Sequence, residues 1–298
     1  MRRSKVLTDL PALDPVRDCQ QILKRMLMFD FPFEMLRAAE FGLFKAYCVP
    51  EMSRLLDATR QIYDRPQARY ENTMYSILGL MEEGPESDEG RAMVRHMNHL
   101  HGHYNIAPKY YRYTLAASVM ENIKLIDGYG WRKLTPEEKQ ALFAFYGQVA
   151  KMMNAEYFDT IEELARYYDE FELTEFRFSV EGHYLAVKNI NLFVSWYPAR
   201  LAPLVRRFAL TMLGPRVRAA CALRTPPAVV QRFILGLMLL RAQVLRYLPA
   251  PDEPISEPKK SHLFYRGGFQ VGRLREFEKP APVPDEMLKH PEHGHRAA

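Results

Sequence analysis

The chain has 298 residues, of which 48% are hydrophobic and 26% are charged, a balance typical of a globular protein with one large or two small domains. Its formal net charge is +5, yet it has no RNP motif, no zinc-finger spacing and no long basic tract. The composition therefore argues against a nucleic-acid partner and favours an anionic cofactor or a membrane surface.

The cysteines and the apolar runs indicate the compartment. Cys19, Cys48 and Cys221 are scattered, which favours a reducing environment over a disulfide framework. Residues 1–11 have no apolar core of the kind found in signal peptides, and no uninterrupted run reaches the roughly 18 apolar residues of a spanning helix. The nearest run, 229–248, is interrupted by arginines and stays open as an interfacial helix. We therefore expect a cytoplasmic location, with peripheral membrane contact left open.

Helical patterns follow one another along most of the chain. Asp14 and Pro15 read as an N-cap and first helical residue, opening a helix to about Met28. The clearest helix start is Thr135-Pro136-Glu137-Glu138, a capping box with proline in the first turn. The other helices are expected near residues 33–48, 51–62, 67–81, 91–106, 109–125, 160–172, 178–196, 198–213 and 226–247.

These patterns predict an all-α fold. No run alternates over the length of a strand, and glycine is scarce at 15 residues. We expect a single globular domain of about ten helices over residues 14–250. Residues 251–298 begin Pro-rich and lack a clean period, so we interpret them as an extended or partly disordered C-terminal tail.

Motifs of the common enzyme classes are missing from the sequence. There is no GxGxxG before a helix, no Walker loop, no HExxH and no GxSxG. A di-iron centre would need Glu-x-x-His pairs on two helices, and the sequence does not offer two of them. These absences direct attention to the stretch RAMVRHMNHLHGHYNI at residues 91–106, which holds four of the nine histidines.

A helical wheel separates these four histidines. At about 100° per residue, Met93, Met97, Leu100 and Tyr104 form one apolar stripe. His101 points about 50° from the centre of that stripe, on its apolar side. His96, His99 and His103 fall on the other flank, and Arg91 and Arg95 point away from the stripe. The wheel therefore predicts one inward histidine and three near the rim.

Three interpretations of this segment remain open. His101 could be an ordinary core histidine bonded to a backbone carbonyl, since a buried imidazole needs a partner for each ring nitrogen. It could instead bind a metal, because histidine is the commonest metal ligand. A zinc site from His96, His99 and His103 is the third interpretation, although no Cys, Asp or Glu stands nearby in the sequence to complete it.

Several motifs, taken in order, resemble one protein family. They are Arg69-x3-Thr73, then RHMNHLHGHYNI, RYTL at 112–115, YGWRKLTPEE at 129–138 and PRVRAACALRTPP at 215–227. The order resembles the haem-dependent oxygenases that include bacterial rubber oxygenases (latex clearing proteins) and a fungal ER-bound oxygenase of mycophenolic acid biosynthesis. The resemblance covers roughly residues 14–250.

The resemblance implies an all-α fold around a buried b-type haem. The proximal iron ligand of the family matches His101, and an alignment slipped by two residues would select His99 or His103 instead. Arg69 and Thr73 match an arginine and a threonine that the family keeps close to the haem, and we expect them to act in catalysis. Arg95 and His103 are expected as further haem contacts.

One position departs from the rubber oxygenases, and one role finds no match. Where those enzymes can carry a lysine able to reach the iron, this chain has Asn72, so a lysine-closed state is not expected. Their catalytic glutamate does not align, and Glu40 and Glu51 are merely nearby acids.

The sequence thus predicts a haem b-dependent oxygenase that acts on a small lipophilic substrate with dioxygen. The apolar slot, the axial histidine and the cations that such a cofactor needs are all available in the composition. The alternatives are a non-catalytic helical protein that binds haem or lipid, and a cofactor-free interaction protein at a membrane surface. We expect the tail to be dispensable for haem binding, and the oligomeric state stays open.

Overall fold

A computed structural model describes residues 13–249, 251, 253–256, 258–260, 262–269, 271–272 and 280–289. Within these residues the chain forms thirteen α-helices, one π-helix, two 3-10 helices and no β-strand. The α-helices are α1 (Cys19–Arg25), α2 (Pro32–Tyr47), α3 (Pro50–Ala58), α4 (Gln61–Asp64), α5 (Pro66–Glu83), α6 (Asp88–His101), α7 (Pro108–Tyr129), α8 (Pro136–Met152), α9 (Ile161–Glu175), α10 (Val180–Ser195), α11 (Ala202–Met212), α12 (Gly214–Ala220) and α13 (Ala228–Tyr247). The short elements are η2 (Met26–Asp30), η3 (Ala199–Leu201) and η4 (Asp285–Met287).

The predicted all-α domain is confirmed, with local corrections. The capping box at Thr135 is present, with both of its reciprocal hydrogen bonds. The first helix begins later than predicted, because the Asp14 carboxylate accepts the backbone N–H groups of Val16 and Arg17 and holds a turn there. The helix expected at 51–62 is divided at Arg60, whose φ of +59° is incompatible with a continuous helix.

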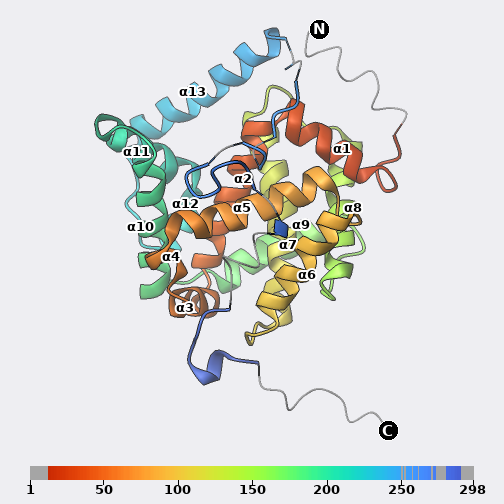
Figure 1. The fold of residues 1–298 in the computed structure, drawn as a ribbon. Helices are drawn as coiled ribbons and strands as arrows, with labels where there is room; N and C mark the ends of the chain where they lie inside the picture. The colour runs from red at the N-terminus through yellow and green to blue at the C-terminus, as the bar shows by residue number, and fades with distance from the viewer. Residues whose placement is uncertain are drawn as a thin grey trace.

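Helices α2 and α7 pack along each other at the centre of the molecule (Figure 1). On one side, α1, α8 and α9 enclose a core that includes Phe145 and Tyr168. On the other, α5, α10 and α11 enclose a second core that includes Phe44 and Phe193. The apolar surface buried in these two cores is the main favourable term for the fold.

A buried ionic cluster ties three helices together between these cores. The Lys45 ammonium of α2 pairs with Glu172 of α9, and it lies 3.2 Å from Glu121 of α7. The Tyr113 hydroxyl donates to the same Glu172 carboxylate at 3.2 Å. Because each of these charges is removed from water, the loss of one partner would leave another charge buried and uncompensated.

The described part of the C-terminal segment packs on α5, in contrast to the extended tail predicted from its composition. Tyr265 is fully buried, and its hydroxyl donates to Asn72 at 2.5 Å. The backbone N–H groups of Phe264 and Tyr265 donate to the Glu71 carboxylate. Figure 1 shows this segment crossing α5 before it continues toward the C-terminus. Of the predicted tail, residues 273–279 and 290–298 lie outside the described residues.

Candidate functional site

The candidate site begins with the hairpin of α5 and α6. Gly84 ends α5 at a φ of +88°, a conformation that glycine adopts without strain. The Ser87 hydroxyl then accepts the N–H of Gly90 and caps α6. A Cβ at Gly90 would lie only 1.9 Å from the Gly84 carbonyl oxygen, so this glycine permits the close approach that sets α6 against α5.

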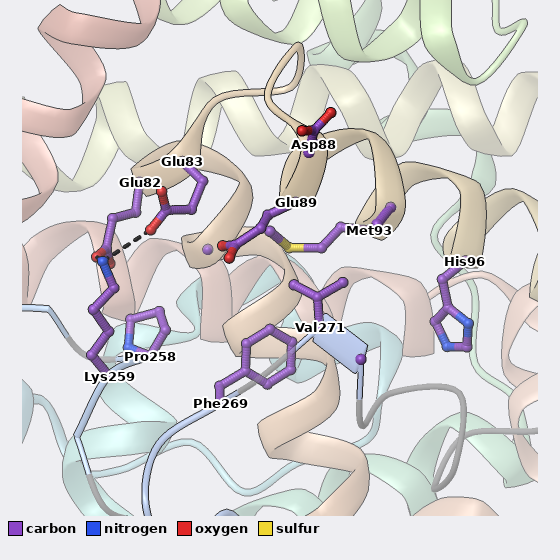
Figure 2. A pocket seen from close by; sticks show the side chains of 13 residues that line it. Glu82, Glu83, Asp88, Glu89, Met93, His96, Pro258, Lys259, Phe269 and Val271 are labelled. Carbon is purple, nitrogen blue, oxygen red and sulfur yellow. Dashed lines mark ion pairs between the residues drawn. The ribbon is translucent and has the colours of Figure 1, made fainter.

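A pocket of about 800 Å³ lies between α5, α6 and the C-terminal segment, a volume within the range of cofactor sites. Figure 2 shows His96 at one end of this pocket and the ion pair of Glu82 with Lys259 at the other, with Phe269 and Val271 between them. The residues that line it are Gly79, Glu82, Glu83, Asp88, Glu89, Ala92, Met93, His96, Pro258, Lys259, Phe269, Val271 and Gly272. The wall therefore combines the apolar Met93, Phe269 and Val271 with the carboxylates of Glu82, Glu83, Asp88 and Glu89, and Glu89 lies between the two ends in Figure 2.

His96 is the most buried histidine of the helix, at 5% exposure, so the helical-wheel orientation was wrong for this residue. The wheel placed it on the rim because it uses only the apolar residues of the helix itself and contains no information about the segments that pack on that flank of α6. In the structure, α5 packs against this helix at Met93, and Phe269 and Val271 of the C-terminal segment cover the pocket that His96 lines. Contacts between such distant parts of the chain have no signal in helical periodicity.

His101 occupies the last position of α6 and is half-buried. Its Nδ1 atom is enclosed, and its ring stands edge-on to Tyr111 of α7 with 5.6 Å between the ring centroids. His99 and His103 are exposed, and their rings lie 4.8 Å apart. The zinc alternative is not supported, because His96 is buried while His99 and His103 face solvent. Within the described ranges, no three His, Cys, Asp or Glu side chains converge as a metal site.

The structure brings Arg69 and Thr73 together on α5. The Arg69 Nη1 donates to the Thr73 hydroxyl at 2.5 Å, and that hydroxyl donates to the Arg69 carbonyl at 2.9 Å. Both residues line a narrow depression of about 10 Å³ that also contains Tyr47 and Asn189, room for about one water molecule. Arg95 is exposed on α6, as the wheel predicted.

A buried acid stands next to this depression. The Tyr70 hydroxyl, whose ring lines the depression, donates to Glu40 of α2 at 2.5 Å. Arg37 lies 2.8 Å from the same carboxylate. Burial and the negative charge of Glu40 raise the pKa of Tyr70 well above its ordinary value. Tyr70 therefore keeps its proton at neutral pH and donates it to the hydrogen bond with the Glu40 carboxylate.

Sequence reasoning missed the contribution of the C-terminal segment to this region. Asn72 was noted only as a replacement for a lysine, whereas here it accepts the hydroxyl of the buried Tyr265. His262 of the same segment bonds Tyr75 through its Nδ1 at 2.5 Å. The aromatic residues of 262–269 were the available signal, since a disordered tail is usually poor in aromatics.

The arrangement of the helices is similar to that of a solved structure. The fold is similar to a solved structure of latex clearing protein LCP in the closed state, with a TM-score of 0.55 and 15% sequence identity. The match covers 96% of this chain and 80% of that chain. At this level of identity the likeness shows a shared fold.

Residues 33–243 match the family described as ER-bound oxygenase mpaB/B'/rubber oxygenase, catalytic domain. The chain belongs to this family, and the resemblance drawn from its motifs is confirmed. It is 25% identical over 250 residues to the ER-bound oxygenase mpaB' of Penicillium brevicompactum, a match that covers 77% of this chain and 59% of the relative.

A second relative matches a shorter stretch. The ER-bound oxygenase mpaB of Penicillium roqueforti (strain FM164) is 31% identical over 133 residues, covering 42% of this chain and 44% of the relative. The chain thus spans less than two thirds of the length of the curated relatives that it matches.

Proposed function

We propose that this protein is a haem b-dependent oxygenase that acts on a lipophilic substrate with dioxygen. The observation that carries the proposal is the match of residues 33–243 to an oxygenase catalytic domain. The residues around α6 fit such a cofactor, because the buried His96 lines the pocket and the half-buried His101 ends the same helix. The pocket beside this helix has the volume of a cofactor site, and Met93, Phe269 and Val271 give it an apolar part.

Following the family motif, we propose that His101 would hold the iron, and its place in the adjacent pocket makes His96 the competing ligand. When bound, haem with one histidine ligand would supply the coordination position at which dioxygen binds and is activated. Arg95, at the middle of α6, and His103, just after its end, are exposed, and they would meet the cofactor's carboxylates. The acidic end of the pocket would repel those carboxylates, and Lys259 there already pairs with Glu82 and Glu83.

The chain's own side chains would then position and protonate the reactants. Arg69, fixed by its hydrogen bond to Thr73, lines the depression and not the pocket beside α6, so its positive charge would act on the part of the substrate that reaches this depression. Glu40, bonded to Tyr70, is the buried carboxylate that would accept a proton. The aromatic and aliphatic lining of the neighbouring cores would keep water from a lipophilic substrate.

Oxygen uptake by the haem-loaded protein tests this function. Compounds with isoprenoid, polyketide and fatty chains should be offered with a reductant, and at least one class should raise the oxygen uptake above the substrate-free rate. Haem-loaded protein that consumes no additional oxygen with any class would favour the second candidate, a non-catalytic haem- or lipid-binding protein. The long exposed helix α13 is the observation that favours lipid contact.

We also propose that the protein works at a membrane surface, on the cytoplasmic side. The relatives that it matches are named ER-bound oxygenases, and α13 is apolar and largely exposed. Sedimentation of the protein with membranes from its own cells would support this location, whereas complete recovery in the soluble fraction would contradict it.

A further inference from the structure

Helix α13 carries an outward stripe of exposed apolar side chains. By length and hydropathy it is the one helix in the described part of the chain that could span a membrane, yet only 17% of its most apolar window is buried. Six residues, 46–80% exposed, form what we call the outer stripe: Val229, Phe233, Leu237, Leu240, Val244 and Tyr247. At 100° per residue they fall within an arc of about 80°. The opposite side, with Ile234, Met238 and Ala242, is buried against the domain.

The surroundings of the outer stripe are basic. Residues 182–251 contain ten lysines and arginines and no aspartate or glutamate, although the whole chain is only +5. On α13 itself, Arg232 and Arg246 are exposed, and the wheel places Arg232 about 100° and Arg246 about 140° from the centre of the outer stripe. Arg224, shortly before the helix, is exposed too. An apolar stripe on a helix with exposed arginines matches the two layers of a bilayer interface, the acyl chains and the anionic headgroups.

We propose that the outer stripe of α13 docks the protein on the surface of a membrane rich in anionic phospholipids, with the helix axis parallel to the membrane plane. Figure 1 shows α13 at the periphery, where it projects beyond α11. This inference deepens the peripheral location proposed above by naming its surface and lipid class, and it does not depend on haem.

Two other arrangements fit the structure less well. A spanning orientation would pull α13 off the domain, breaking the 2.6 Å ion pair of Arg241 with Glu34 of α2 and placing three arginines of the helix in hydrocarbon. A symmetric dimer through the outer stripe would bring two copies of the same acid-free segment together, and like charges oppose that contact. An anionic lipid surface satisfies both the apolar and the basic side chains.

Vesicle flotation with the full-length, haem-supplied protein tests the apolar part of the proposal. The double variant Leu237→Glu, Leu240→Glu should lose about tenfold or more of its affinity for vesicles of phosphatidylcholine and phosphatidylglycerol. The matched control is Leu173→Glu, which alters a 67% exposed leucine on α9 and should bind like the wild type. Equal binding by the double variant, or an equal loss in the control, would overturn the proposal.

The basic part has its own test. The variant Arg232→Gln, Arg246→Gln should bind these vesicles about 25-fold more weakly, taking about fivefold for each arginine near the surface. Wild-type binding should weaken with salt and on pure phosphatidylcholine. Three outcomes would contradict docking. The wild type could show no preference for anionic vesicles, or it could stay bound to membranes after alkaline carbonate washing. The third is a wild type that binds no vesicles and forms a dimer that the Leu237→Glu, Leu240→Glu variant abolishes. Haem content, measured on the same samples, separates this result from the fate of the oxygenase proposal.

Discussion

His101 and His96 stand five residues apart on α6, and the haem proposal assigns them different roles. We predict that His101→Ala removes most of the bound haem, because the iron then loses its bond to the protein and keeps only apolar and carboxylate contacts. His96→Ala should retain the cofactor, because it removes at most a hydrogen bond of about 0.5–1.5 kcal/mol. Haem content and the position of the Soret band are the measurements.

The reverse pattern would move the ligand into the pocket. If His96→Ala lost haem while His101→Ala kept a wild-type Soret band, His96 would be the ligand and the family register would be wrong by five residues. His99→Ala is the control, because its side chain is exposed on the same helix and should leave the spectrum unchanged.

Arg69, Thr73 and His96 show which features of a site a single sequence can predict and which it cannot. Arg69 and Thr73 contact each other, and this relation is readable from the sequence, because residues four positions apart in a helix lie on the same face. The burial of His96 depends on residues 269 and 271, which lie more than 170 positions away. Periodicity reports only the local surroundings of a residue, so this contact was inaccessible.

At the scale of elements, the ionic cluster of α2, α7 and α9 makes a prediction about pH. Burial alone would raise the pKa of Glu172, but the Lys45 ammonium outweighs burial and holds this pKa below its ordinary value of 4.5. A lowered folded-state pKa stabilises the fold above about pH 4.5, and this contribution is lost as the pH falls through the lowered value. We therefore expect Glu172→Gln to cost about 3 kcal/mol of unfolding free energy at pH 7.

Denaturant unfolding of both proteins between pH 7 and pH 3 measures this cost. The difference between wild type and Glu172→Gln should narrow as the pH falls through the lowered pKa of Glu172, where the wild-type carboxyl becomes neutral as well. A difference that stays constant over this range would show that the charge of Glu172 contributes nothing. Glu170→Gln is a suitable control, because Glu170 is an exposed acid on the same helix.

The C-terminal segment gives a second prediction at this scale. Tyr265→Phe keeps the buried ring and removes the hydroxyl that bonds Asn72, so we expect a loss of about 1 kcal/mol in unfolding free energy. Leu263→Ala, at a position that is 68% exposed, should change the stability far less. Identical unfolding curves for Tyr265→Phe and the wild type would mean that the segment does not hold α5 in solution. The dispensability of residues 251–298 for haem binding stays a prediction, and it conflicts with a haem in the pocket beside α6, whose lining includes Pro258, Lys259, Phe269, Val271 and Gly272. A chain ending at Ala250 decides between them, because a folded chain that loses haem would make the segment part of the site.

Most helices were predicted from the sequence because their signals are local. Caps, prolines and the 3.6-residue period located α5, α8 and α13 to within about three residues. The period failed at α12, whose seven residues GPRVRAA are too short to show it. It also failed for residues 262–269, which hold their place through long-range contacts with α5 and not through a helical pattern.

For the whole molecule, family membership and fold are established by the match over residues 33–243 and by the likeness to the latex clearing protein structure. The cofactor is the central claim, since the oxygenase chemistry proposed for this chain requires it. The pocket beside α6, which His96 lines and His101 does not, is where the structure offers room for it.

The most direct measurement is a pyridine haemochrome assay on the purified full-length protein produced with an adequate haem supply. The account predicts about one haem b per chain, held without covalent attachment because the sequence lacks a C-x-x-C-H motif. Haem far below one per chain, in protein that is folded by circular dichroism and still does not take up haem when it is added, would contradict it.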